Sequence, residues 1–284
     1  MLIGVAGTTT IHLSKGVMRL GIQQLQTART QNRSTRRASA MYALGVAMNF
    51  TNPLWVILAN RFAPTVFYTS MYGVGLIALV VFASVVLHER LHRNQLIGVA
   101  IVLLGTTLVG IGNLTGHMAS LYTANRTVLV GFAIAWFVAA PLGSLVLRRR
   151  SLGLQEVFFG IAAGGLAGLE AVVKGVAQAG AVQNTLLPTD SAAWWLFGAS
   201  FLGAAGAFGM IQWSYLRSCR ASVMGSVYNV AYVALPLLLT VLVVQEAFLG
   251  VWSIAGLLVL TAGVLAIGSG GTSAGRVAPT PRTG

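Results

Sequence analysis

Long apolar stretches recur along this chain, and the short segments between them carry most of its charges. A helix needs about 20 apolar residues to cross the roughly 30 Å hydrocarbon layer of a bilayer. The pattern predicts about nine such helices, whereas a β-barrel would show segments of about ten alternating residues. The predicted spans are residues 1–23, 41–60, 64–87, 95–113, 128–147, 153–181, 193–216, 221–244 and 247–268.

Composition agrees with a polytopic, all-α membrane protein. The 284 residues are 56% hydrophobic and only 8% charged, against about 25% charged residues in soluble domains. The net charge of +13 comes from residues between the spans, so we expect no nucleic acid as partner. One cysteine, Cys219, excludes an internal disulfide framework. No catalytic set, nucleotide loop or metal-ligand spacing occurs, so we expect neither an enzyme nor a bound cofactor or metal.

The basic residues also predict an orientation, because cytoplasmic loops hold the excess of Lys and Arg. With the N-terminus outside and the C-terminus cytoplasmic, 14 of the 18 basic residues lie inside and two, Arg61 and Arg126, lie outside. The other two, Lys15 and Lys174, fall within spans. We therefore expect a multi-pass protein of the cell (plasma or inner) membrane. Residues 269–284 are rich in Gly, Ser, Thr and Pro, which predicts a disordered cytoplasmic tail.

The two halves of the chain share landmarks at a nearly constant offset. Because the equivalent helices run in opposite directions, these landmarks predict two inverted repeats, five helices in residues 1–150 and four in 151–268. The landmarks are Lys15-Gly16-Val17 with Lys174-Gly175-Val176 (offset 159), Glu89 with Glu246 (offset 157), and Gly98, Gly105 and Gly110 with Gly256, Gly263 and Gly268 (offset 158).

One of these landmarks points to a family. Glu89-Arg90-Leu91, followed by Gln95, Gly98 and a glycine-spaced helix, resembles the repeat signature of the drug/metabolite transporter superfamily with its EamA-like repeats. Lys15-Gly16, Ala63-Pro64 and nine rather than ten spans resemble its NIPA-type branch, which is associated with magnesium transport. The chain departs from that branch at Ser14, where a second lysine is usual, and the Glu246 copy lacks the following Arg-Leu.

Three charged residues fall inside predicted spans, where charge is costly and marks candidate functional sites. Glu170 and Lys174 are spaced i,i+4 in the favourable order for an ion pair, either to line a cavity or merely to neutralise each other. Lys15 has no acidic residue within one turn, so it either snorkels to the interface or lines a pathway. His12, one turn earlier, is more typical of a core residue than of a proton relay.

Polar and aromatic side chains complete the predicted substrate pathway. Asn49 and Asn52 flank a proline break of the kind that lines binding sites, although a simple kink is an equal alternative. Glu89 and Glu246 close helices near opposite membrane faces, as gates or as caps. Gln212 adds an amide, and paired tyrosines one turn apart either clasp a substrate or simply pack. These pairs are Tyr68 with Tyr72 and Tyr228 with Tyr232.

The sequence therefore predicts a secondary transporter that moves a small solute by alternating access. A magnesium or other divalent-cation transporter is the nearest alternative, and a non-transporting membrane partner or assembly subunit is the alternative from another class. Expected partners are a small-molecule or ion substrate and the lipid bilayer, with a homodimer left open.

Overall fold

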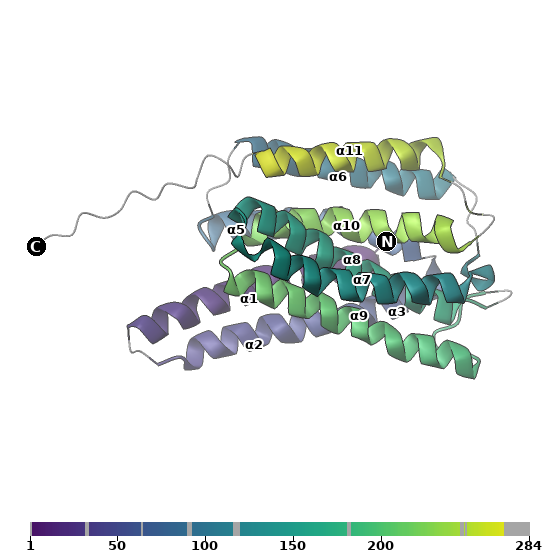
Figure 1. Ribbon diagram of the computed structural model, residues 1–284, viewed down its shortest axis with the longest axis horizontal. Coiled ribbons are helices and arrows are strands. Elements are labelled where there is room, and N and C mark those ends of the chain that lie inside the picture. The colour runs from purple at the N-terminus through teal and green to yellow at the C-terminus, as the bar shows by residue number, and fades with distance from the viewer. Residues whose placement is uncertain are drawn as a thin grey trace, which may run out of the picture.

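The protein is described here as a computed structural model, which covers residues 2–31, 34–63, 65–89, 93–115, 120–180, 183–244, 247 and 249–269. These residues form an all-helical bundle without strands (Figure 1). The helices are α1 (Leu2–Thr30), α2 (Arg36–Phe50), α3 (Asn52–Phe62), α4 (Thr65–Ser70), α5 (Tyr72–Val85), α6 (Arg93–Thr115), α7 (Arg126–Val146), α8 (Leu152–Gln178), α9 (Ser191–Leu216), α10 (Ala221–Val243) and α11 (Val251–Ser269), with short 3-10 helices η1 (Leu121–Thr123) and η2 (Leu147–Arg149).

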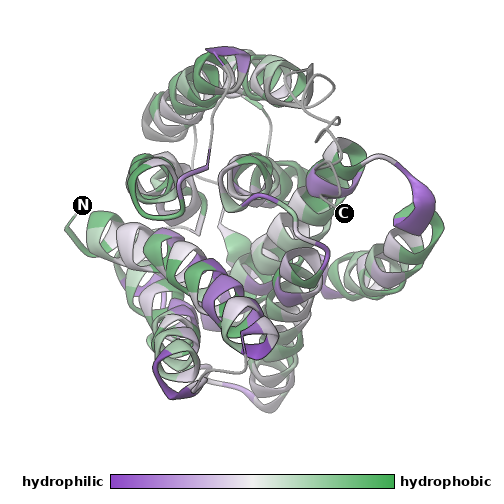
Figure 2. Ribbon diagram, turned by 90° about the vertical axis from the view of Figure 1, so that its left-hand side faces the viewer, coloured by the Kyte–Doolittle hydropathy of each residue, from purple (hydrophilic) through white to green (hydrophobic). Residues whose placement is uncertain are grey.

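Several of these helices suit a bilayer. Within the described residues, six helical segments are long and apolar enough to cross a membrane, and two shorter apolar helices cover Leu96–Gly112 and Val251–Ala266. Seen nearly end-on in Figure 2, the ribbons of the bundle are mostly hydrophobic. The prediction of a polytopic helical membrane protein is thus supported, while the count of nine spans and their orientation stay predictions. The six segments are Arg36–Phe62, Thr65–Val85, Arg126–Arg149, Leu152–Gln178, Ser191–Leu216 and Ala221–Val243.

The predicted second span is helical but is broken in two, as the proline suggested. α2 ends at Phe50 and α3 begins at Asn52, with Pro53 in the first turn of α3. Thr51 bridges the break: its hydroxyl donates to Met48 O at 2.7 Å and accepts from Trp55 Nε1 at 3.0 Å. Side chains therefore satisfy part of the kink, as the simpler alternative required, but the break also turns Asn52 into the core, where it is 7% exposed.

Helix α8 lies at the centre of the bundle. Its residues from Phe159 to Gln178 are buried, except Ile161. It packs against α9 and α10, just as α1 packs against α2 and α5 in the other half. α5 and α10 join the halves, because they contact each other as well as their own partners.

The glycine-spaced helices α6 and α11 pack side by side along one edge of the bundle (Figure 1). A Cβ on Gly105 would lie 3.0 Å from Gly256 O, and a Cβ on Gly263 would lie 3.0 Å from Gly98 O. Gly98 corresponds to Gly256 and Gly105 to Gly263 in the predicted repeat, so the two contacts join equivalent pairs of residues. Such reciprocal, antiparallel contacts are what a pseudo-twofold axis requires, although the division into repeats remains a prediction.

Candidate substrate pathway

Glu170 and Lys174 form an ion pair on α8, as their spacing predicted. Both side chains are fully buried. Lys174 Nζ also lies 4.1 Å from the centre of the Phe201 ring of α9. Gly203 lets α9 pack closely against Glu170, because a Cβ on Gly203 would lie only 3.0 Å from Glu170 Cβ. The pair is therefore held between α8 and α9 inside the bundle.

Asn52 connects this ion pair to Tyr72 of α5. Its amide Nδ2 donates to Glu170 Oε2 at 3.3 Å, and its Oδ1 accepts from the Tyr72 hydroxyl at 3.4 Å. Lys174, Glu170, Asn52 and Tyr72 thus make one connected polar chain across α8, α3 and α5. Buried polar groups that are satisfied in this way hold one arrangement of the helices.

Lys15 approaches Tyr72 from α1. Its side chain is 0% exposed, so it does not snorkel to the interface. Its ammonium lies 3.3 Å from the centre of the Tyr228 ring and 5.3 Å from that of Tyr72. Tyr232 stacks on Tyr72 with 3.9 Å between ring centres. The structure therefore brings the two predicted tyrosine pairs together, and one ring of each pair, Tyr72 and Tyr228, faces this lysine.

Several polar atoms around Tyr72 have no hydrogen-bond partner among the described residues. They include the Lys15 ammonium, the Tyr68 and Tyr232 hydroxyls and His12 Nε2. His12 Nδ1 lies 2.9 Å from Thr8 O, and the ring packs 4.7 Å from Tyr72. Buried polar groups are nearly always paired in native proteins, so this cluster calls for an explanation.

A second polar cluster, which the sequence did not single out, lies at the C-terminal ends of α3 and α8. Asn60 Nδ2 donates to Gln178 Oε1 at 3.0 Å, and Thr65 donates to Asn60 Oδ1 at 3.0 Å. Gln178 Nε2 also donates to Leu186 O at 2.8 Å, and Asn184 Nδ2 donates to Asn60 O at 2.9 Å. In the predicted orientation this cluster closes the outer end of the bundle.

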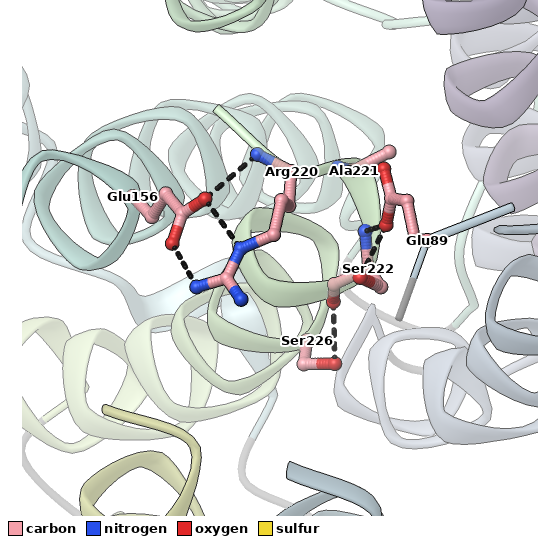
Figure 3. Close-up of polar contacts among 6 residues, drawn as sticks. All are labelled: Glu89, Glu156, Arg220, Ala221, Ser222 and Ser226. Carbon is pink, nitrogen blue, oxygen red and sulfur yellow. Dashed lines mark hydrogen bonds and ion pairs between the residues drawn. The ribbon is translucent and has the colours of Figure 1, made fainter. Parts of the chain in front are cut away.

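The opposite end is closed by two carboxylates that meet at the start of α10 (Figure 3). Glu89 accepts from Ala221 N at 2.9 Å, from Ser222 N at 3.1 Å and from the Ser222 hydroxyl. Glu156 accepts from Arg220 N at 2.8 Å and pairs with the Arg220 guanidinium through Nε at 2.9 Å and an Nη at 2.8 Å. Glu89 therefore caps α10 rather than its own helix.

Two groups beside this cap lie outside the membrane-spanning helices. Hydrogen bonds to Glu156 raise the pKa of Arg220 above its ordinary value. Burial, and secondarily the Glu156 charge, raises the pKa of Cys219 to about 12. Its thiol is thus protonated and 0% exposed.

Cavities reach this core from two directions. One of about 330 Å³ opens beside Gly4, Ala59 and Met71 and ends at Tyr68. Another, of about 270 Å³, lies among apolar residues of α7, α8 and α9 and is lined at its base by Glu170. Tyr68, in the lining of the first cavity, packs edge-on against Tyr72 with 6.2 Å between ring centres.

Two predicted pathway residues lie apart from the core. Asn49 is partly buried and accepts from the Ser14 hydroxyl at 3.5 Å. Gln212 accepts from the Tyr42 hydroxyl at 3.0 Å and donates to Met18 Sδ at 3.1 Å. The structure groups neither with the Glu170–Lys174 pair. Glu246 lies outside the described residues.

Comparison of the chain with protein-family models, with curated proteins and with solved structures finds no match to any of them.

Proposed function

We propose that this protein is a secondary transporter that moves a small solute across a membrane by alternating access. The observation that carries the proposal is the polar core: Lys15, Tyr72, Asn52, Glu170 and Lys174 are buried together where helices of both halves meet. Charged residues inside a membrane bundle are costly and are kept where a solute or ion passes. Such sites near the middle of two packed repeats are usual in secondary transporters.

Other features support the same mechanism. α1 and α8 each pack against two helices of their own half, and α6 packs against α11 with reciprocal glycine contacts. The bundle has a hydrogen-bonded closure at each end, Asn60 with Gln178 at one and Glu89 with Ser222 at the other. Two ends that open in turn around a fixed core are the requirement of alternating access. The resemblance to the drug/metabolite transporter superfamily agrees with this proposal.

The magnesium alternative is less well supported. Among the described residues, no group of three or more His, Cys, Asp or Glu side chains could hold a metal ion. Of the described residues, the polar core named above holds Lys15, Lys174 and Glu170, and that glutamate is paired with Lys174. Mg²⁺ prefers oxygen ligands, usually carboxylates, and is repelled by ammonium groups.

The test is solute flux in liposomes that contain the purified full chain. Glu170→Gln and Lys174→Ala should each reduce the flux of any transported solute at least tenfold, because both remove the buried pair. Asp190→Asn is the matched control: it removes a carboxylate whose ion pair with Arg126, 3.7 Å long, is exposed. Flux equal to that of protein-free liposomes for every solute would instead favour a non-transporting membrane partner.

A further inference from the structure

The buried charges of the core do not balance. Among the described residues, Glu170 is the only carboxylate in the core. Its two oxygens already interact with Lys174 and with the Asn52 amide. Among the described residues, Lys15 has no ion pair and no hydrogen-bond acceptor. Arg19, one turn further along α1, is 7% exposed and donates to the Tyr215 carbonyl at 3.2 Å. Within the described part of the chain, neither of these two basic groups of α1 is therefore paired with a carboxylate.

Two more hydrogen-bond donors belong to tyrosines that pack against Tyr72, whose ring Lys15 faces. The Lys15 ammonium offers three donors, and the Tyr68 and Tyr232 hydroxyls offer one each, while all three groups lack partners among the described residues. Aromatic faces stabilise an ammonium in part, but they accept no conventional hydrogen bond from it. A carboxylate or phosphate, with several acceptor lone pairs, is the group that satisfies such a set.

We propose that Lys15 binds the anionic group of the transported solute, so that the substrate class is an organic anion carrying a carboxylate or phosphate. This inference rests on the proposed transport function and narrows its substrate. Tyr68, which packs against Tyr72, also lines the cavity of about 330 Å³. The rings of Tyr72 and Tyr228 hold the ammonium in place until the anion draws it away.

A cation does not suit this site. An ammonium solute would meet the Lys15 charge in surroundings of low dielectric, where like charges repel strongly. A neutral solute would leave the charge of Lys15 without a counter-ion. The electrostatics that disfavour Mg²⁺ at this site therefore favour an anionic solute.

The test uses liposomes that contain the full chain and are loaded with a deproteinised extract of cellular metabolites. Released solutes are identified by mass spectrometry and sorted by charge. We expect anions to be released above the level of protein-free liposomes. Lys15→Met should lower that release at least tenfold, whereas Lys15→Arg, which keeps the charge, should recover a substantial part of it.

Folding is checked by the melting temperature of each variant in detergent. Methionine matches the length of the lysine stem and removes an unpaired buried charge, so Lys15→Met should melt no lower than the wild-type protein. Release of cations or neutral solutes alone would overturn the anion assignment and leave the transport proposal standing. Release of nothing would refute transport itself. A Lys15→Met variant that releases anions normally, or that loses release together with its fold, would show that Lys15 is structural.

Discussion

The cap that Glu89 places on α10 gives a prediction whose size can be worked from the structure. Arg220, the residue before α10, makes no side-chain cap of its own. Glu89, 132 residues away from Ala221 in sequence, accepts from two amides of the first turn and from the Ser222 hydroxyl. Glu89→Ala removes both acceptor oxygens and all three hydrogen bonds at once.

The cost follows from capping and charge. Loss of a capping side chain costs about 0.5–2 kcal/mol, and loss of a negative charge at a partly buried helix N-terminus costs up to about 2 kcal/mol. Because Glu89 is itself partly exposed, we expect about 2–3 kcal/mol for Glu89→Ala. Glu89→Gln keeps one acceptor oxygen and loses the charge, so about half of that cost should remain.

The measurement is reversible unfolding in mixed micelles, titrated with sodium dodecyl sulfate and followed by tryptophan fluorescence. A cycle with Ser222→Ala isolates the side-chain contact, which should contribute about 1 kcal/mol of coupling. If Glu89→Ala unfolds within about 0.5 kcal/mol of the wild-type protein, or if the glutamine and alanine variants are equal, the carboxylate does not cap α10.

Three further outcomes follow from packing and backbone geometry. Gly105→Leu should destabilise the packing of α6 on α11 by about 1–3 kcal/mol, because a Cβ on Gly105 would lie 2.8 Å from Leu260 N. Gly131→Leu is the control and should not destabilise the protein, because a Cβ there would have nothing within 4 Å. The same unfolding titration compares the two variants. Cys219 should react with a maleimide at pH 7.5 about a thousandfold more slowly in the folded protein than after denaturation, because its pKa in the folded protein is raised to about 12. The labelling rates are measured by mass spectrometry, and equal rates in the two states would contradict this prediction. His88 has a left-handed backbone conformation, with φ 54°. His88→Gly should therefore leave stability unchanged, whereas His88→Val should lower it by about 1–2 kcal/mol. Equal melting temperatures of the two variants would contradict a left-handed conformation at this residue.

Local spacing made part of the site predictable. The Glu170–Lys174 pair follows from i,i+4 spacing on one helix, and the broken second span follows from Pro53. The helices themselves follow from runs of apolar residues, because a chain in lipid satisfies its backbone within each helix. Whatever depends on one helix alone was therefore within reach of the sequence.

Contacts between helices that are far apart in the sequence could not be predicted. Glu156 and Arg220 lie 64 residues apart, and Asn60 and Gln178 lie 118 apart. The only available signal was a shared offset: Asn52 with Glu170 and Asn60 with Gln178 are both separated by 118, as polar pairs on two parallel helices must be. Without knowing which helices are neighbours, that regularity cannot be told from chance.

In the predicted repeat, the two lysines differ in the residue that lies one turn before them. Lys15 and Lys174 are equivalent at an offset of 159, so the position equivalent to Glu170 is Ile11, a buried residue that is 1% exposed. Ile11→Glu would place a carboxylate one turn before Lys15, in the same order as Glu170 and Lys174.

That substitution tests the unpaired charge without removing the lysine. If Lys15 binds an anionic solute, a neighbouring carboxylate should compete for it, and anion release from liposomes should fall at least tenfold. Ile11→Gln, similar in shape but uncharged, should retain more release than Ile11→Glu. Equal release from the two variants, each shown to be folded by its melting temperature, would mean that the pairing state of Lys15 has no part in transport. A selective loss in Ile11→Glu would mean that transport depends on the departure from symmetry at residue 11.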